Sequence, residues 1–109
     1  MADGNFVSIR GRVLRDADEK YVRAGLRVID FTLAVDHPDN DKPVYVDCYG
    51  LNDACDALGG YVNAGEQISV EGHLSFRTYT SKSGQRRSGM VVYAERVDYV
   101  DNGDEMGMI

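Results

Sequence analysis

A short segment near the end of the chain concentrates positive charge and aromatic rings. The stretch LSFRTYTSKSGQRRS, residues 74–88, contains no acid, although the whole 109-residue chain has a formal net charge of -6. Its basic and aromatic residues are Arg77, Lys82, Arg86, Arg87, Phe76 and Tyr79. Cations that follow a phosphate backbone and rings that stack on bases are what binding to a single strand requires.

Alternation divides this segment between the two faces of one strand, because successive side chains of a strand point to opposite faces. Leu74 and Phe76 continue the apolar face of the preceding residues, and we predict that both belong to the core. Arg77 and Tyr79 fall on the opposite, outer face, where Tyr79 is the best candidate for stacking. The remaining cations adjoin the predicted hairpin tip SKSGQ and form a basic arm: Lys82, Arg86 and Arg87.

Two further pairs of residues are candidates for contacts with DNA. Arg10 and Arg12 share the outer face of the first strand, where ion pairs with acids or a contact between subunits are the alternatives. Tyr45 and Tyr49 are four residues apart on a short strand and therefore share a face. Whether either tyrosine stacks on a base or is buried for structural reasons stays open at this point.

The charge is distributed unevenly along the chain. Between residues 28 and 72, nine acids face Lys42 alone, whereas between residues 73 and 97 five bases face Glu95 alone. A binding surface depends on the local field rather than on the total charge. The acidic total therefore does not exclude a nucleic-acid ligand, and it argues against indiscriminate binding to duplex DNA.

Strand-like alternation runs through most of the chain. The alternating stretches are NFVSIRGRVLRD, LRVIDFTLAVD, VYVDCYG and SGMVVYAERVDYV, and NAGEQISVEGHLSFRTYT reads as a turn and then a long strand. ADEKYVRAGLR reads as a connection. Residues 51–62, LNDACDALGGYV, have helical spacing and predict one short helix. Gly11 and Gly72 suit strands that bend around a small closed sheet. We predict an all-β fold, a five-stranded OB barrel with one short α-helix between strands 3 and 4, with a small open sandwich as the alternative.

The sequence resembles the bacterial single-stranded DNA-binding protein family over nearly its whole length. The resemblance rests on N-x-V-x-I-x-G-R-V from Asn5, VIDFTLAV after Gly25, YVDCYG, YVNAGEQISVEGHL, and RTYTSKSGQRR followed by VVYAERVDYV, in that order. It implies an OB fold, a homo-oligomer (tetramer or dimer), and binding of single-stranded DNA in replication, recombination or repair. It also matches Tyr79 to a base-stacking position and implies that the basic hairpin closes over DNA.

Catalytic, metal and membrane signals are missing from the sequence. There is no Ser/His/Asp spacing, glycine-rich phosphate loop or HExxH motif, and Cys48 and Cys55 read as reduced, buried thiols. We therefore predict no enzymatic activity, no cofactor and no metal site. No apolar run is long enough to span a membrane and no secretory signal is visible, so we predict a cytoplasmic protein.

The last nine residues differ in composition from the rest. We predict a DNA-binding domain over residues 1–100 and a short acidic C-terminal tail over residues 101–109, in place of the long tail of the family. The acidic then apolar ending of the tail suggests a docking peptide for replication or repair proteins, with a frayed terminus as the alternative. For the whole chain, the alternatives are a primosomal replication protein N-like OB dimer and an OB module used only for protein interaction.

Overall fold

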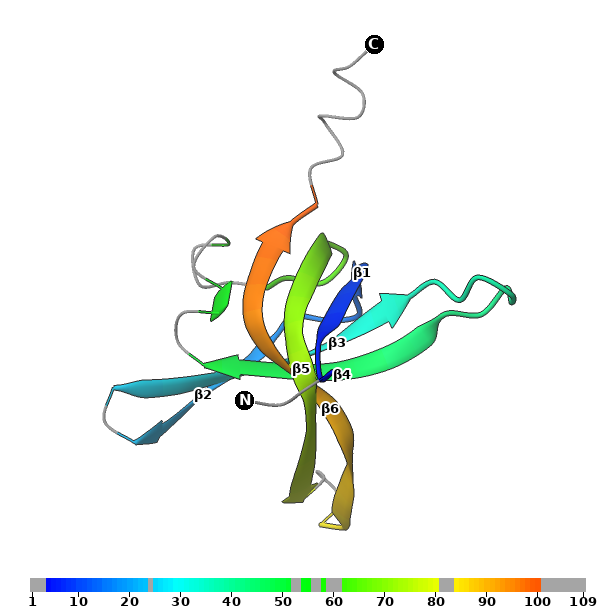
Figure 1. The fold of residues 1–109 in the computed structure, drawn as a ribbon. Helices are drawn as coiled ribbons and strands as arrows, with labels where there is room; N and C mark the ends of the chain where they lie inside the picture. Colours follow the sequence, from blue (N-terminus) through cyan, green and yellow to red (C-terminus); the bar gives the residue numbers. More distant parts are fainter. Residues whose placement is uncertain are drawn as a thin grey trace.

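The protein forms one sheet of six strands, seen in a computed structural model that describes residues 4–23, 25–51, 54–55, 58, 62–80 and 84–100 (Figure 1). The strands are β1 Val7–Val13, β2 Asp18–Arg23, β3 Leu26–Val35, β4 Val44–Leu51, β5 Gln67–Thr80 and β6 Arg86–Tyr99. β1, β3 and β5 lie within the stretches whose alternation predicted strands. β4 runs one residue past its stretch, to Leu51, and β6 begins two residues before its stretch, at Arg86.

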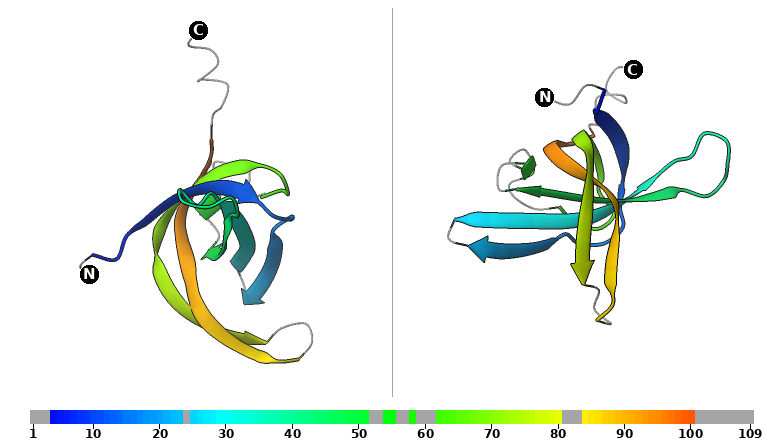
Figure 2. Two further views of the ribbon diagram at one scale, coloured as in Figure 1. Left: turned by 90° about the vertical axis from the view of Figure 1, so that its right-hand side faces the viewer. Right: turned by 60° about the horizontal axis from the view of Figure 1, so that its bottom comes forward.

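The strands are paired in the order β1-β5-β6-β4-β3-β2. Paired strands run antiparallel, except that β4 and β6 are parallel. The end of β1 also pairs with β3, through Arg12↔Ala34 and Val13↔Leu33, so the pairings lead from β1 through β5, β6, β4 and β3 back to β1. Three hairpins project in different directions from this closed circuit of paired strands (Figure 2). They are β2–β3, β3–β4 and β5–β6.

The core lies inside the circuit of paired strands. Ile29 and Leu33 of β3 and Ile68 and Val70 of β5 are completely buried, as the period-two alternation requires. Burying each of these side chains contributes about 1.5–3 kcal/mol of transfer free energy. The connection between β4 and β5 completes the core with Ala54, Cys55, Leu58 and Val62.

The short α-helix predicted over residues 51–62 is wrong. Within that stretch Ala54, Cys55 and Leu58 lie in 3₁₀ conformation, and no α-helix occurs among the residues that the structure describes. The helical spacing did identify side chains that reach the core, because these three residues are buried. An α-helix is disfavoured because the stretch contains Gly59 and Gly60, and so short a helix gains little from its own hydrogen bonds.

The predicted five-stranded barrel is also wrong, because the described sheet has six strands. The additional strand, β2, occupies the stretch that we interpreted as a connection. It pairs with β3 from Asp18↔Asp30 to Arg23↔Leu26. Gly25, with a φ of 74°, supplies the left-handed backbone conformation in the turn between the two strands. The sequence DEKYVR is too polar for alternation to reveal this strand.

The predicted burial of Leu74 and Phe76 is wrong, since these side chains are 45% and 66% exposed. The register between β5 and β6 shifts between Glu71 and Gly72, at one of the two glycines predicted to bend strands. A Cβ atom on Gly72 would lie 1.9 Å from the carbonyl oxygen of Tyr93, so the two strands approach too closely there for any side chain. Beyond this point β5 and β6 leave the core as a projecting hairpin (Figure 1).

Candidate functional site

A row of rings crosses the outer face of β4, β6 and β5. Tyr49 lies opposite Tyr93 in the register of β4 with β6, and Tyr93 lies opposite His73 of β5. The ring centroids of Tyr49 and Tyr93 are 5.1 Å apart with an edge-to-face angle of 66°, and those of His73 and Tyr93 are also 5.1 Å apart. We call Tyr49, Tyr93 and His73 the ring row. At its far end, His73 Nδ1 lies 3.5 Å from a carboxylate oxygen of Glu95.

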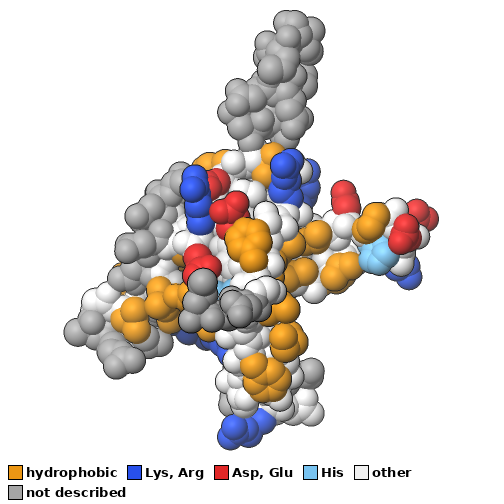
Figure 3. Space-filling view, viewed as in Figure 1, with side chains coloured by type: hydrophobic (Ala, Val, Ile, Leu, Met, Phe, Trp, Pro, Cys, Tyr) orange, Lys and Arg blue, Asp and Glu red, His pale blue; other side chains and the backbone are white. Residues whose placement is uncertain are grey.

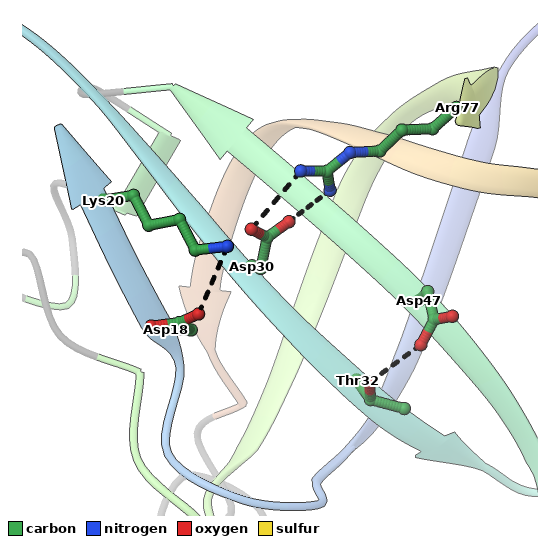
Figure 4. Close-up of polar contacts among 6 residues, drawn as sticks. All are labelled: Asp18, Lys20, Asp30, Thr32, Asp47 and Arg77. Atoms are coloured by element: carbon green, nitrogen blue, oxygen red, sulfur yellow. Dashed lines mark hydrogen bonds and ion pairs between the residues drawn. The ribbon is translucent and has the colours of Figure 1, made fainter. Parts of the chain in front are cut away.

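Arg77 of β5 lies at the Tyr49 end of the ring row. Its guanidinium carbon is 4.8 Å from the centroid of the Tyr49 ring. Its Nη1 and Nη2 atoms donate to the two carboxylate oxygens of Asp30 on β3, with 3.4 Å between Nη2 and Oδ2 (Figure 4). The side chains of Arg77 and Asp30 are only 31% and 23% exposed, so water screens this ion pair incompletely. The positive charge of Arg77 is therefore balanced within the protein.

An open groove of about 370 Å³ lies beside this ion pair. Thr32 Oγ1 donates to Asp47 Oδ1 there at 2.8 Å, and Lys20 Nζ lies 3.6 Å from Asp18 Oδ2 (Figure 4). The groove is lined by Arg15, Asp16, Asp18, Lys20, Asp30, Phe31, Thr32, Asp47, Cys48, Arg77 and Val91. Because aspartates outnumber cations in this lining, the groove does not offer a field that attracts phosphate.

The projecting hairpin carries apolar side chains on one face. Phe76 lies directly opposite Met90 in the register, and alternation places Leu74 on the same face. All three side chains are exposed, and Figure 3 shows apolar side chains along this hairpin. The alternating apolar residues of β5 therefore continue beyond the core, where their side chains are exposed instead of buried.

Of the basic arm predicted from the sequence, the structure describes the side chain of Arg86, which lies near the tip of this hairpin. Arg86 is exposed, and Figure 3 shows positive charge at the end of the hairpin. The backbones of Tyr79 and Arg87 pair with each other across β5 and β6. Their side chains, and the whole of Lys82, lie outside the described part of the chain, as does the tail over residues 101–109.

Arg10 and Arg12 are not brought to the ring row. Both are exposed on β1, where Arg10 lies opposite Ser69, a residue of β5 that precedes Arg77 by eight positions. Arg12 Nη1 donates a hydrogen bond of 2.7 Å to the backbone carbonyl of Gly65. Arg12 therefore anchors the turn that leads into β5.

Tyr45 and Tyr49 share the outer face of β4, where they lie opposite Ala34 and Asp30 of β3. Their environments differ. Tyr45 is 61% exposed near the start of β4, whereas Tyr49 is half-buried between Tyr93 and Arg77. Of the two tyrosines, Tyr45 presents more of its ring to a ligand.

The sequence analysis did not identify three residues of this site as functional: Tyr93, Asp30 and His73. His73 is four residues before Arg77 on the same strand, so alternation puts it on the outer face predicted for Arg77, and this was the usable signal. Asp30 and Arg77 are 47 residues apart, and only the pairing of β3 with β4, β4 with β6 and β6 with β5 brings them together. That strand order could not be deduced from alternation alone.

The cysteine at the floor of the groove is protected from ionisation. Burial raises the pKa of the Cys48 thiol to about 12, and the neighbouring Asp47 carboxylate adds to this increase. Cys55 is also buried, and both cysteines are free thiols.

Among the described residues, no three His, Cys, Asp or Glu side chains cluster in a way that could hold a metal ion. Within the same residues, no helix is long and apolar enough to cross a membrane.

Comparison with known proteins identifies the family. Residues 4–100 match the model of the single-strand binding protein family. The chain therefore belongs to this family. A single-stranded DNA-binding protein of Borreliella burgdorferi is 27% identical over 110 residues, which cover 94% of this chain and 74% of that protein. Single-stranded DNA-binding protein 1 of a Nostoc species is 32% identical over 96 residues, covering 86% of this chain and 81% of the relative.

A solved structure has the same fold. The N-terminal domain of the PriB protein from Thermoanaerobacter tencongensis, solved as a dimeric structure, matches 90% of this chain and 98% of its own with a TM-score of 0.67. At 21% sequence identity this likeness concerns the fold alone.

Proposed function

We propose that the protein binds single-stranded DNA without sequence preference and protects it in replication, recombination or repair. The observation that carries this proposal is a row of rings on an outer sheet face, next to a projecting hairpin with a cationic tip, in a chain of the single-strand binding protein family. Rings that stack on bases and cations that follow the backbone are the two requirements for binding a single strand.

The proposed contacts divide by chemistry. The hairpin supplies Tyr79 for stacking and cations for phosphates, and Tyr45 adds an exposed ring on β4. Tyr49 stands at one end of the ring row, with the guanidinium of Arg77 over its ring. Arg10 adds a cation on β1, and Arg12 does so only in part, because it already binds a backbone carbonyl. The phosphate contacts that we propose on the hairpin are Lys82, Arg86 and Arg87.

We further propose that residues 1–100 form the binding domain and that the protein acts in the cytoplasm as a homo-oligomer. Its role is binding rather than catalysis.

The acidic residues of the 101–109 tail are proposed to dock replication or repair proteins. Deleting this tail should leave single-strand affinity unchanged and weaken capture of replication proteins, whereas unchanged capture would contradict the docking role.

The proposal is tested by titrating the protein with oligo-dT of increasing length while recording tyrosine fluorescence. We expect quenching that saturates, an affinity that rises with length until the strand fills the site, and little response to a duplex of equal length. Equal response to duplex and single strand, or none to either, would contradict the proposal.

A second candidate is a primosomal replication protein N-like dimer that serves mainly to recruit partner proteins. The likeness to the dimeric PriB fold favours it. The same titration separates the candidates, because such a dimer should bind oligo-dT weakly. Light scattering on the free protein then distinguishes a dimer from a tetramer.

A further inference from the structure

We infer that Arg77 contacts a base through the flat face of its guanidinium rather than contacting a phosphate, and that Asp30 is the positioning residue that holds it there. This inference rests on the proposed function and specifies which part of the strand one side chain touches. The sequence alone suggested the opposite, because Arg77 lies in the basic segment that predicted phosphate contacts.

Two neighbours fix the orientation of this guanidinium. Asp30 engages both terminal nitrogens of Arg77 with its two carboxylate oxygens. Such a fork-to-fork contact defines the plane of the guanidinium as well as its position. The ring of Tyr49 lies 4.8 Å from the guanidinium carbon and supports the group from one side. Arg77 is thus a fixed, delocalised, planar group, and such groups stack on aromatic rings.

Arg77 also borders the open groove. Arg77 and Asp30 both line it, and its lining includes two apolar residues, Val91 and Phe31. A base entering the groove therefore meets a flat cationic group and apolar surface. Stacking of bases against arginine is one of the ways in which proteins hold single strands.

The charge around Arg77 disfavours a phosphate at the same place. Its own charge is balanced by Asp30. In the rest of the lining the three aspartates outnumber the two cations: Asp16, Asp18 and Asp47 against Arg15 and Lys20. A phosphate would have to displace Asp30 and approach these carboxylates, so it would gain little attraction and release few counterions. Arg86 differs, because it is exposed near the tip of the hairpin and away from this groove.

The test compares Arg77→Gln and Arg77→Lys with the matched control Arg86→Gln. Each variant is titrated with oligo-dT and with an oligonucleotide of the same length in which alternate nucleotides are abasic. Arg77→Gln should lose roughly 5- to 150-fold in affinity for oligo-dT and clearly less for the abasic strand, with an unchanged salt slope. Arg77→Lys should not restore affinity, because an ammonium group has no flat face.

The control should behave differently. Arg86→Gln should weaken both oligonucleotides equally and reduce the slope of log affinity against log salt by about 0.7. If Arg77→Gln shows this pattern, or if Arg77→Lys retains wild-type affinity, Arg77 contacts a phosphate and the inference is wrong. Unchanged affinity of Arg77→Gln for oligo-dT contradicts it equally.

The role of Asp30 is tested by Asp30→Asn, which keeps the size of the side chain and removes its charge. Loss of affinity for oligo-dT at constant salt slope is the result expected of a positioning residue. Higher affinity with a steeper salt slope would show that Asp30 withholds Arg77 from phosphates, and would overturn the inference. The ratio of oligo-dT to abasic affinity is taken within each variant, so partial unfolding of a variant does not distort it.

The two levels of the proposal fail separately. If the wild-type protein does not bind oligo-dT at all, the proposed function is wrong. If it binds and its Arg77 variants follow the phosphate pattern, only the inference about Arg77 is wrong.

Discussion

Replacing Gly72 with alanine tests how the hairpin is attached to the core. A Cβ atom at this position would lie 1.9 Å from the carbonyl oxygen of Tyr93, 2.9 Å from its carbonyl carbon and 3.1 Å from the amide nitrogen of Glu95. All three atoms belong to the backbone of β6, so no side-chain rotation relieves the contact. Ordinary contact begins at 3.4 Å, and β5 and β6 must therefore separate by about 1.5 Å.

The expected cost follows from this displacement. Overpacking a well-packed site costs roughly 1–3 kcal/mol and occasionally more. Separating the strands also weakens the hydrogen bonds beside the register shift at Gly72, each of which contributes about 1 kcal/mol. We therefore expect Gly72→Ala to lower the free energy of unfolding by about 3 kcal/mol. For a chain of this size that corresponds to a melting temperature lower by roughly 13 °C.

Thermal unfolding followed by circular dichroism measures the effect, with Gly89→Ala as the matched control. Gly89 lies on the same hairpin, and a Cβ atom there meets nothing within 4 Å. The control should melt within about 2 °C of the wild-type protein, because a surface substitution changes stability by no more than about 0.5 kcal/mol. Equal melting temperatures for the two variants would refute the close approach of β5 and β6 at Gly72.

Four further predictions concern binding, ionisation and stability. Tyr79→Ala should weaken binding to oligo-dT by roughly 1–3 kcal/mol, the loss of one stacked base, and unchanged affinity in a folded variant would exclude the stacking role. Because burial raises the pKa of Cys48 to about 12, its thiol should react slowly with a disulfide reagent at pH 8 until the protein is denatured; equally fast reaction of the native protein would contradict the burial. The same increase in pKa makes stability depend on pH, because the thiol of Cys48 ionises more easily in the unfolded chain than in the folded protein. The stabilisation from a neutral Cys48 is complete below pH 9 and is lost as the pH rises toward 12. Urea unfolding at a series of pH values measures this loss. Asn5→Ala removes two hydrogen bonds to the backbone of Leu74, of 3.1 Å and 2.8 Å, and should lower the free energy of unfolding by about 1–2 kcal/mol in urea; an unchanged midpoint would show that these exposed bonds contribute nothing.

Alternation predicted which residues share a face, and it did so well where a face is covered. Ile29, Leu33, Ile68 and Val70 occupy the apolar positions of two alternating stretches, and all are completely buried. Alternation does not say where the core ends. Phe76 continues the same period as Ile68, but it lies on the projecting hairpin, where nothing in the described chain covers it.

The predicted helix illustrates a similar limit. The helical spacing of the stretch predicted that Ala54, Cys55 and Leu58 share a face toward the core, and all three are buried. It could not distinguish an α-helix from 3₁₀ turns that bring the same side chains inward. Since tertiary packing rather than propensity stabilises most short helical segments, the packing of this connection decides its conformation.

The site was harder to predict than the core because it depends on strand order. The basic segment revealed Arg77, but its role depends on Asp30, which only the paired strands bring within reach. A cation predicted from composition thus lies in an ion pair over a tyrosine ring. The distinction between Tyr45 and Tyr49 likewise required the neighbours of each ring rather than their spacing.

The most direct test of single-strand binding is a competition experiment. A labelled oligo-dT bound to the protein is challenged with one unlabelled sequence, supplied either as a single strand or as its duplex at the same phosphate concentration. We predict that the single strand displaces the label and that the duplex does not, because paired bases cannot reach rings on a sheet face. Equal displacement by both would show that the protein recognises phosphate alone, and would contradict the account.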